Sequence, residues 1–249
     1  MCLMANHDPN SAVPVSGAPT LTCWSCGEMR AAHFCSACGK VQPPQPVDYF
    51  AFFGLPRKLN LDAAALEKDF YELSRRLHPD VNVLSDQREQ EWSLEQTSQL
   101  NDAYRTLKDP IKRTEYLLRL EGVELEEQSK SATEKARVSG QVKKQVVPPD
   151  LLEEVFDLNM QLEELRAQKK LGEDDPALIE EIGRQKLELE EKQDALLAQL
   201  KGDWQQWDRA LDEGSDQDRR RVRDKMVDLL NRRNYLRNLL RDVSEVMEA

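Results

Sequence analysis

Four cysteines near the N-terminus have the spacing of a metal site. Cys23 and Cys26 form one C-x2-C pair, Cys35 and Cys38 form a second, and a glycine follows each pair. Two cysteines on one tight turn present their sulfurs to the same point, and two such turns supply the four thiolates that Zn²⁺ binds tetrahedrally. The segment is too short to bury a core, so metal binding would supply its folding energy. We therefore predict a module over residues 21–42 with a closed, structural zinc.

The same four cysteines could instead form disulfides, act as a redox pair or bind iron. The first twenty residues contain neither Lys nor Arg, so we expect no export signal and a cytoplasmic chain, in which disulfides are uncommon. A redox C-x2-C is expected within a βαβ pattern, which the sequence lacks. Iron stays open as the metal because a tetrahedral set of four sulfurs also accepts it. Cys2 is predicted to be a free thiol, and His33 could compete as a ligand.

The tripeptide His78-Pro79-Asp80 lies between two segments of helical periodicity. Pro79 cannot continue a helix and biases His78 to extended geometry, so the loop should be stiff. Asp80 as a helix cap, His78 as a metal ligand and an ordinary polar turn are the alternative interpretations. Apolar stripes at helical spacing flank the loop, made of Leu66, Phe70, Leu73 and Leu77 before it and Leu94, Leu100, Tyr104 and Leu107 after it. They predict an antiparallel helical hairpin.

From Asp48 to Leu118 the chain resembles a J domain, the module by which J-proteins stimulate ATP hydrolysis by DnaK-type chaperones. Such domains carry His-Pro-Asp between their second and third helices, with basic residues late in the second. The resemblance implies that the chaperone-binding residues are His78, Pro79 and Asp80, with Lys68, Arg75 and Arg76 as their basic surround.

Further residues narrow the resemblance to HscB-type co-chaperones of iron–sulfur cluster assembly. DYFAFFGLP, residues 48–56, is similar to the opening of that family's J domain, and NDAYRTLKDPIKRTEYLLRL to the end of its third helix. The cysteine segment resembles the N-terminal extension of zinc-bearing members. The expected partners are a DnaK/HscA-type chaperone and an iron–sulfur scaffold protein, with no nucleic acid, no membrane and an unknown oligomeric state.

Three apolar stripes follow in residues 150–249 and predict an antiparallel, coiled-coil-like three-helix bundle, although a generic dimerisation arm has the same periodicity. The stripes are Leu151, Val155, Leu158, Leu162 and Leu165; Ile182, Leu189, Leu196, Leu200, Trp204 and Trp207; and Val222, Met226, Leu229, Leu236, Leu240 and Val243. In HscB-type proteins this bundle binds the scaffold. The matching positions here are Leu152, Phe156, Asp157, Glu164 and Tyr235, while Glu153 and Met160 depart from the family pattern. Leu152 and Phe156 could instead be bundle core.

Composition fits this all-α architecture. The chain is 39% hydrophobic and 33% charged with a net charge of −11, which is typical of a solvated helical protein rather than a nucleic-acid binder. The predicted order is a disordered N-terminus (1–20), the cysteine module (21–42), the J domain (47–120), a linker (121–149) and the bundle (150–249). We predict a non-enzymatic co-chaperone that activates a partner's ATPase. A general J-protein for unfolded clients and a thiol oxidoreductase are the alternatives.

Overall fold

The computed structural model describes residues 22–29, 33–82, 85–123, 125, 149–172 and 175–248. Within these residues every regular element is helical, apart from two isolated antiparallel bridges, Thr22 to Met29 and Phe34 to Val41. The predicted all-α class is therefore confirmed. The predicted disordered N-terminus and nearly all of the predicted linker lie outside the described residues. No helix in the described part of the chain is long and apolar enough to cross a bilayer.

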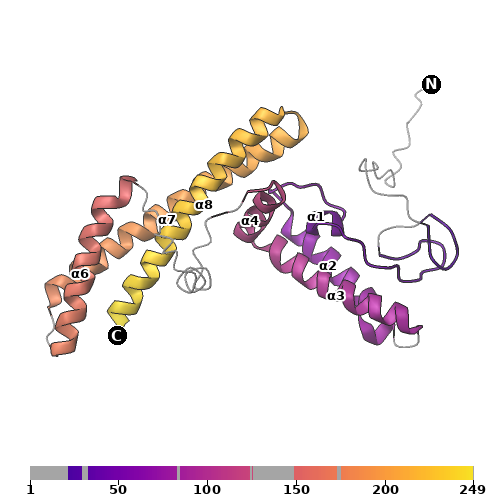
Figure 1. Cartoon of the computed structure of the whole chain (residues 1–249), viewed down its shortest axis with the longest axis horizontal. Helices are drawn as coiled ribbons and strands as arrows, with labels where there is room; N and C mark the ends of the chain where they lie inside the picture. The colour runs from indigo at the N-terminus through magenta and orange to yellow at the C-terminus, as the bar shows by residue number, and fades with distance from the viewer. Residues whose placement is uncertain are drawn as a thin grey trace, which may run out of the picture. The chain divides into compact units, whose positions relative to one another are not determined.

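The helices follow the order predicted from the stripes (Figure 1). They are α1 (Tyr49–Phe52), α2 (Ala63–Leu77), η1 (Pro79–Val81), α3 (Gln87–Lys108), α4 (Pro110–Leu120), η2 (Pro149–Leu151), α6 (Leu152–Leu171), α7 (Pro176–Asp212) and α8 (Asp216–Glu248). The chain separates into two compact units. The first combines Met1–Asp48 with Lys68–Ala103, and the second combines Tyr49–Glu67 with Tyr104–Ala249. The boundaries fall inside α2 and α3, so both helices contribute to both units.

Helices α2 and α3 form the predicted antiparallel hairpin. The Tyr104 hydroxyl, late in α3, donates to Glu67 early in α2 at 3.2 Å, whereas Thr97 donates to the carbonyl of Leu77 at the other end of α2 at 3.0 Å. The predicted stripe is wrong at one position, because Leu94 is 63% exposed. The buried residues nearest to Leu94 along α3, which are Glu89, Ser93 and Gln96, are polar.

The segment ending in residue 120 is two helices rather than one. Asp109 lies between α3 and α4, and its carboxylate accepts hydrogen bonds from the backbone N–H groups of Ile111 and Lys112. Pro110 takes the first helical position, where its missing N–H costs nothing. The resulting corner turns α4 toward α1, and the ring of Tyr116 stacks on Tyr49 with centroids 4.5 Å apart.

Helices α6, α7 and α8 form the predicted three-helix bundle, and α7 and α8 run side by side over their length (Figure 1). Gly172 closes α6 in a left-handed conformation with φ of 73°. The carboxylate of Asp175 then caps α7, with Pro176 at its first position. The α6 stripe and the parts of the α7 and α8 stripes that pack against it form one buried cluster, which contains Leu158, Leu165 and Ile182.

The same helix pair contributes to a second core. Helix α6 has 20 residues, whereas α7 and α8 have 37 and 33, so α6 covers only part of the α7–α8 pair. The apolar residues nearest the α7–α8 turn pack instead against residues from α1 to α4 in the same compact unit. This second cluster contains Leu200, Trp204, Trp207, Val222, Met226 and Leu230 together with Phe50, Leu59, Leu66, Leu107, Leu117 and Leu118.

Polar contacts from α7 fix the α1–α2 loop over this core. The two carboxylate oxygens of Asp208 accept from the backbone N–H groups of Leu59 and Asn60 at 2.7 and 3.0 Å, and the Asn60 side chain also donates to Asp208. One residue earlier, the Trp207 indole donates to the carbonyl of Arg57 at 3.0 Å. Because Asp208 accepts from the backbone N–H groups of Leu59 and Asn60, loss of its carboxylate would leave these two amides without that partner.

Replacing Asp208 with Ala should lower the free energy of unfolding by about 2 kcal/mol, because charge-assisted bonds to two backbone amides disappear. Urea denaturation would measure the change. The matched control is Asp212→Ala on the same helix, which removes an ion pair to Lys58 in which Asp212 is 53% exposed. That control should cost less than about 1 kcal/mol, and equal losses for the two variants would contradict the assignment.

Candidate functional site

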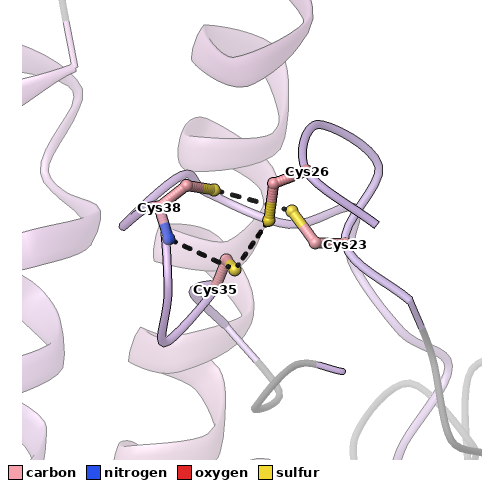
Figure 2. Close-up of side chains that lie close together, drawn as sticks. All are labelled: Cys23, Cys26, Cys35 and Cys38. Carbon is pink, nitrogen blue, oxygen red and sulfur yellow. Dashed lines mark hydrogen bonds between the residues drawn. The ribbon is translucent and has the colours of Figure 1, made fainter. Parts of the chain in front are cut away.

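The four cysteines converge on one point (Figure 2), with all four sulfurs within 4.8 Å of one another. The Sγ atoms of Cys23 and Cys38 are 3.7 Å apart, and those of Cys26 and Cys35 are 3.6 Å apart. Sulfurs at the corners of a tetrahedron, about 2.3 Å from a central zinc, lie about 3.8 Å apart, whereas a disulfide needs about 2.05 Å. The geometry therefore fits a tetrahedral metal site and not a pair of disulfides.

Two similar turns build this site. The amide of Gly27 donates to the carbonyl of Cys23 at 3.0 Å, and the amide of Gly39 donates to that of Cys35 at 2.9 Å. Both glycines have positive φ, 76° and 72°, which a side chain would strain. The turns are joined by the indole of Trp24, which donates to the carbonyl of Val41 at 2.8 Å.

Protein groups around the sulfurs favour thiolates at some of the four positions. Burial raises the pKa of the Cys23 thiol, but hydrogen bonds from the backbone of Cys26 and Ser25 and from the Gln42 side chain outweigh it and lower that pKa to about 6. At Cys26 a backbone hydrogen bond lowers the pKa, yet the Cys35 sulfur and burial raise it to about 12. A divalent cation would displace the protons that remain, since thiolates are the ligands.

The cysteine module packs on α3, a contact that the sequence did not predict. Trp24 meets Trp92 edge to face with centroids 5.6 Å apart, and the Lys40 ammonium lies 2.7 Å from the carboxylate of Glu89. Glu89 is only 1% exposed, so this pairing compensates an otherwise costly buried charge. No local pattern marks these α3 residues, because their partners lie about 50 to 70 positions earlier in the chain.

Two glutamine side chains link α3 to Cys23, one of the four candidate metal ligands. The Gln96 side chain donates to the carbonyl of Gln42 at 2.7 Å and bonds the His33 ring at 2.8 Å. The Gln42 side chain in turn donates to the Cys23 sulfur at 3.3 Å. His33, considered as a competing ligand, thus bonds an amide on α3, and the group of potential ligands found around the sulfurs consists of the four cysteines.

The His78-Pro79-Asp80 loop lies directly after α2, and the side chains of His78 and Asp80 reach solvent. The side chains of His78 and Asp80 are 51% and 89% exposed. Residues 79–81 form the short helix η1, in which the Val81 amide donates to the His78 carbonyl at 3.0 Å. The amide of Asp80 donates to the His78 ring at 3.2 Å. The loop therefore presents an imidazole and a carboxylate outward on a hydrogen-bonded turn.

The basic residues predicted around the loop lie on the same helix. Lys68, Arg75 and Arg76 are all exposed on α2. The Arg76 guanidinium also lies 3.9 Å from the centre of the Phe34 ring, in the cysteine module. The position of Arg76 thus depends on the cysteine module as well as on its own helix.

The residues predicted to bind a scaffold differ in exposure. Leu152 and Phe156 on α6 are 58% and 65% exposed, and the predicted neighbours Asp157 and Glu164 are also exposed. Met160, on the same helix, is 59% exposed. Tyr235 is instead 5% exposed within the bundle core, where burial raises its pKa. The alternative that Leu152 and Phe156 are bundle core is wrong.

Comparison with known proteins identifies the class to which this arrangement belongs. The DnaJ domain family model matches residues 48–116, which include the tripeptide and the helices on either side of it. This part of the chain is therefore similar to a J domain.

Two relatives of the chain carry the name HscB. It is 39% identical over 124 residues to the mouse iron-sulfur cluster co-chaperone protein HscB, covering 47% of this chain and 52% of that protein. It is 44% identical over 79 residues to a Vibrio cholerae co-chaperone protein HscB homolog, covering 32% and 46%. The matches thus span about half the length of these relatives. The predicted similarity to HscB-type J-domain co-chaperones is confirmed.

The fold agrees over a longer stretch. The crystal structure of human co-chaperone protein HscB superposes with a TM-score of 0.60 at 23% identity, covering 90% of this chain and 97% of that one. At this identity the likeness concerns the fold alone, and it supports the order of J domain and helical bundle.

Purified protein should carry close to one tightly bound metal ion per chain, and Cys35→Ser should lose it, because three thiolates do not complete the tetrahedral set. Metal analysis by mass spectrometry would measure the stoichiometry. Cys2→Ser is the matched control, since Cys2 lies outside the two pairs and its replacement should leave the metal content unchanged. Full metal retention by Cys35→Ser would exclude the four-cysteine site.

Proposed function

We propose that this protein is a co-chaperone that couples a DnaK/HscA-type chaperone to an iron–sulfur cluster scaffold. Its His78-Pro79-Asp80 loop docks on the chaperone and stimulates ATP hydrolysis, while its bundle holds the scaffold for cluster transfer. The observation that carries the proposal is the exposed tripeptide on a hydrogen-bonded turn between α2 and α3. The HscB names of the relatives support the proposal that the bound protein is an iron–sulfur cluster scaffold.

The chaperone side requires charge and shape but no chemistry by this chain. Lys68, Arg75 and Arg76 give α2 an exposed basic surface, which would attract an acidic patch on the chaperone and speed its association. The outward Asp80 carboxylate and His78 ring then supply directional contacts. Binding that favours one conformation of the partner shifts its equilibrium by the difference in contact free energy, and so the adaptor activates an ATPase without being an enzyme.

The scaffold side is proposed to be the outer face of α6. Leu152, Phe156 and Met160 are three large apolar side chains spaced by four residues, each more than half exposed, and spacing by four places side chains on one face of a helix. Asp157 and Glu164 lie beside them as charged neighbours. Apolar anchors with a charged rim are typical of a protein-binding surface.

A small acidic groove adjoins this face. A cavity of about 190 Å³ between α6 and α7 is lined on its polar side by Glu154, Asp157, Glu181 and Glu188, with Arg184 as the basic group that pairs with Glu181 and Glu188. The carboxylates outnumber the arginine, so the groove favours basic groups on a scaffold. The buried Tyr235 supports the proposed surface from within the bundle rather than through direct contact.

The cysteine cluster is proposed to hold Zn²⁺ as a structural ion. Residues Cys23, Cys26, Cys35 and Cys38 would occupy all four positions and leave none for a substrate. The ion would fold the module and fix its two turns. Zinc is favoured over iron because it carries no redox chemistry, and the proposed function needs none.

Asp80→Asn should abolish stimulation of the chaperone ATPase and leave scaffold binding intact, because the exposed carboxylate makes no contact that the bundle needs. Single-turnover ATP hydrolysis by a DnaK/HscA-type chaperone would measure stimulation, and calorimetry would measure scaffold affinity. Glu72→Gln, at an exposed position of α2, is the matched control and should behave as the wild type. Normal stimulation of the chaperone ATPase by Asp80→Asn would contradict the proposal.

Phe156→Ser should weaken scaffold binding by at least about tenfold, since a central aromatic anchor is commonly worth more than 1 kcal/mol. The variant should keep its fold, because Phe156 lies outside the core. Leu187→Ser on α7 is the matched control, as Leu187 is exposed to a similar degree, 61%. If both variants bind an iron–sulfur scaffold normally while unfolded clients bind competitively, the protein is a general J-domain co-chaperone instead.

A further inference from the structure

Two adjoining sides of α3 hold the cysteine module and the base of the His78–Asp80 loop at once. On one side Glu89, Trp92 and Gln96 contact the module through an ion pair, a ring contact and two hydrogen bonds. On the adjoining side Ser93 and Thr97 both donate to the carbonyl of Leu77, the last residue of α2. The two sets alternate along the same two turns of one helix.

The loop is tied to that second side. The Asn82 side chain donates to the Ser93 hydroxyl at 3.2 Å and to the carbonyls of Arg76 and His78 at 3.0 and 3.1 Å. The carbonyl of His78 also accepts the amide of Val81. Ser93 is fully buried, so its two bonds have no water to replace them. The position of α3 at Ser93 therefore determines where the loop begins.

The module is tied equally firmly to the first side. Gln42 is fully buried; its carbonyl accepts from the Gln96 side chain, and its own side chain donates to the Cys23 sulfur. Lys40, two residues after Cys38, forms an ion pair with Glu89. In addition Phe34, directly before Cys35, packs under the Arg76 guanidinium. The residues that make these contacts lie within a few positions of the four cysteines, so their placement depends on the two turns.

We propose that the cysteine module braces the chaperone-docking loop, with Gln96 and Glu89 as the positioning residues that transmit the state of the metal site to His78 and Asp80. A filled cluster holds Gln42 and Lys40 against α3, and α3 then fixes Leu77 and Asn82. Loss of the metal frees the module's turns, releases Arg76 from Phe34 and loosens the loop. This inference rests on the proposed docking role of the loop.

The test follows amide hydrogen exchange at Asp80 and Val81 in the whole chain, reconstituted with Zn²⁺ and then treated with a chelator. Chelation should speed exchange at these amides by about fivefold or more, a usual size for coupling between sites. In Gln96→Leu, which removes both hydrogen bonds at similar volume, exchange should already be fast with Zn²⁺ bound and should respond little to chelation. Gln87→Leu, an exposed position on α3, should respond as the wild type does.

A second variant covers the case in which Gln96→Leu does not fold. Glu89→Gln keeps the side-chain shape and removes the charge pairing with Lys40, and it should show the same loss of response to a smaller degree. With the chaperone, both variants should raise the co-chaperone concentration needed for half-maximal stimulation about fivefold at an unchanged maximal rate. A structural defect at the trigger itself would lower the maximal rate instead.

The inference is overturned if chelation speeds exchange within residues 22–42 but leaves Asp80 and Val81 unchanged, which would make the module an independent element. Asp80→Asn separates this failure from failure of the proposed function. If Asp80→Asn loses stimulation while exchange is uncoupled, the docking role stands and the brace is wrong. If Asp80→Asn stimulates normally, the docking role fails and the coupling no longer concerns chaperone binding.

Discussion

The unequal lengths of α6, α7 and α8 are the constraint on which the second compact unit depends. A helix of 20 residues cannot cover the apolar stripes of helices with 37 and 33 residues, so large side chains such as Trp204 and Trp207 need another cover. Burying two tryptophans is worth several kcal/mol. The helices α1 and α4 provide this burial, and the carboxylate of Asp208 fixes the α1–α2 loop by accepting two of its backbone amides.

Much of this architecture could be predicted because its signals are local. Cysteine spacing placed the metal site, and the interruption at Pro79 placed the loop. The periodic leucines of residues 151–243 placed three helices, whose buried faces match the predicted stripes almost position for position. Each of these signals depends on residues within one or two helical turns, where geometry relates sequence spacing directly to a common face.

The contacts between distant segments could not be predicted in this way. Periodicity assigned Leu94 to the hairpin stripe, but at this end of α3 the helix turns polar residues toward the cysteine module and leaves Leu94 exposed. The family pattern suggested a surface role for Tyr235, yet its ring fills the bundle core. The predicted division between residues 120 and 150 likewise misses the core shared by Phe50 and Trp207. A single sequence contains no local signal for such pairings.

The shared core has a consequence for chimeric proteins. If the J domain were replaced by that of another J-protein, the incoming domain would have to match Trp204, Trp207 and Met226, which belong to the opposite end of the chain. A functional graft would need the tip of the α7–α8 hairpin to travel with the domain. Segments more than a hundred residues apart in the sequence, such as those of Phe50 and Trp207, would have to be transferred together.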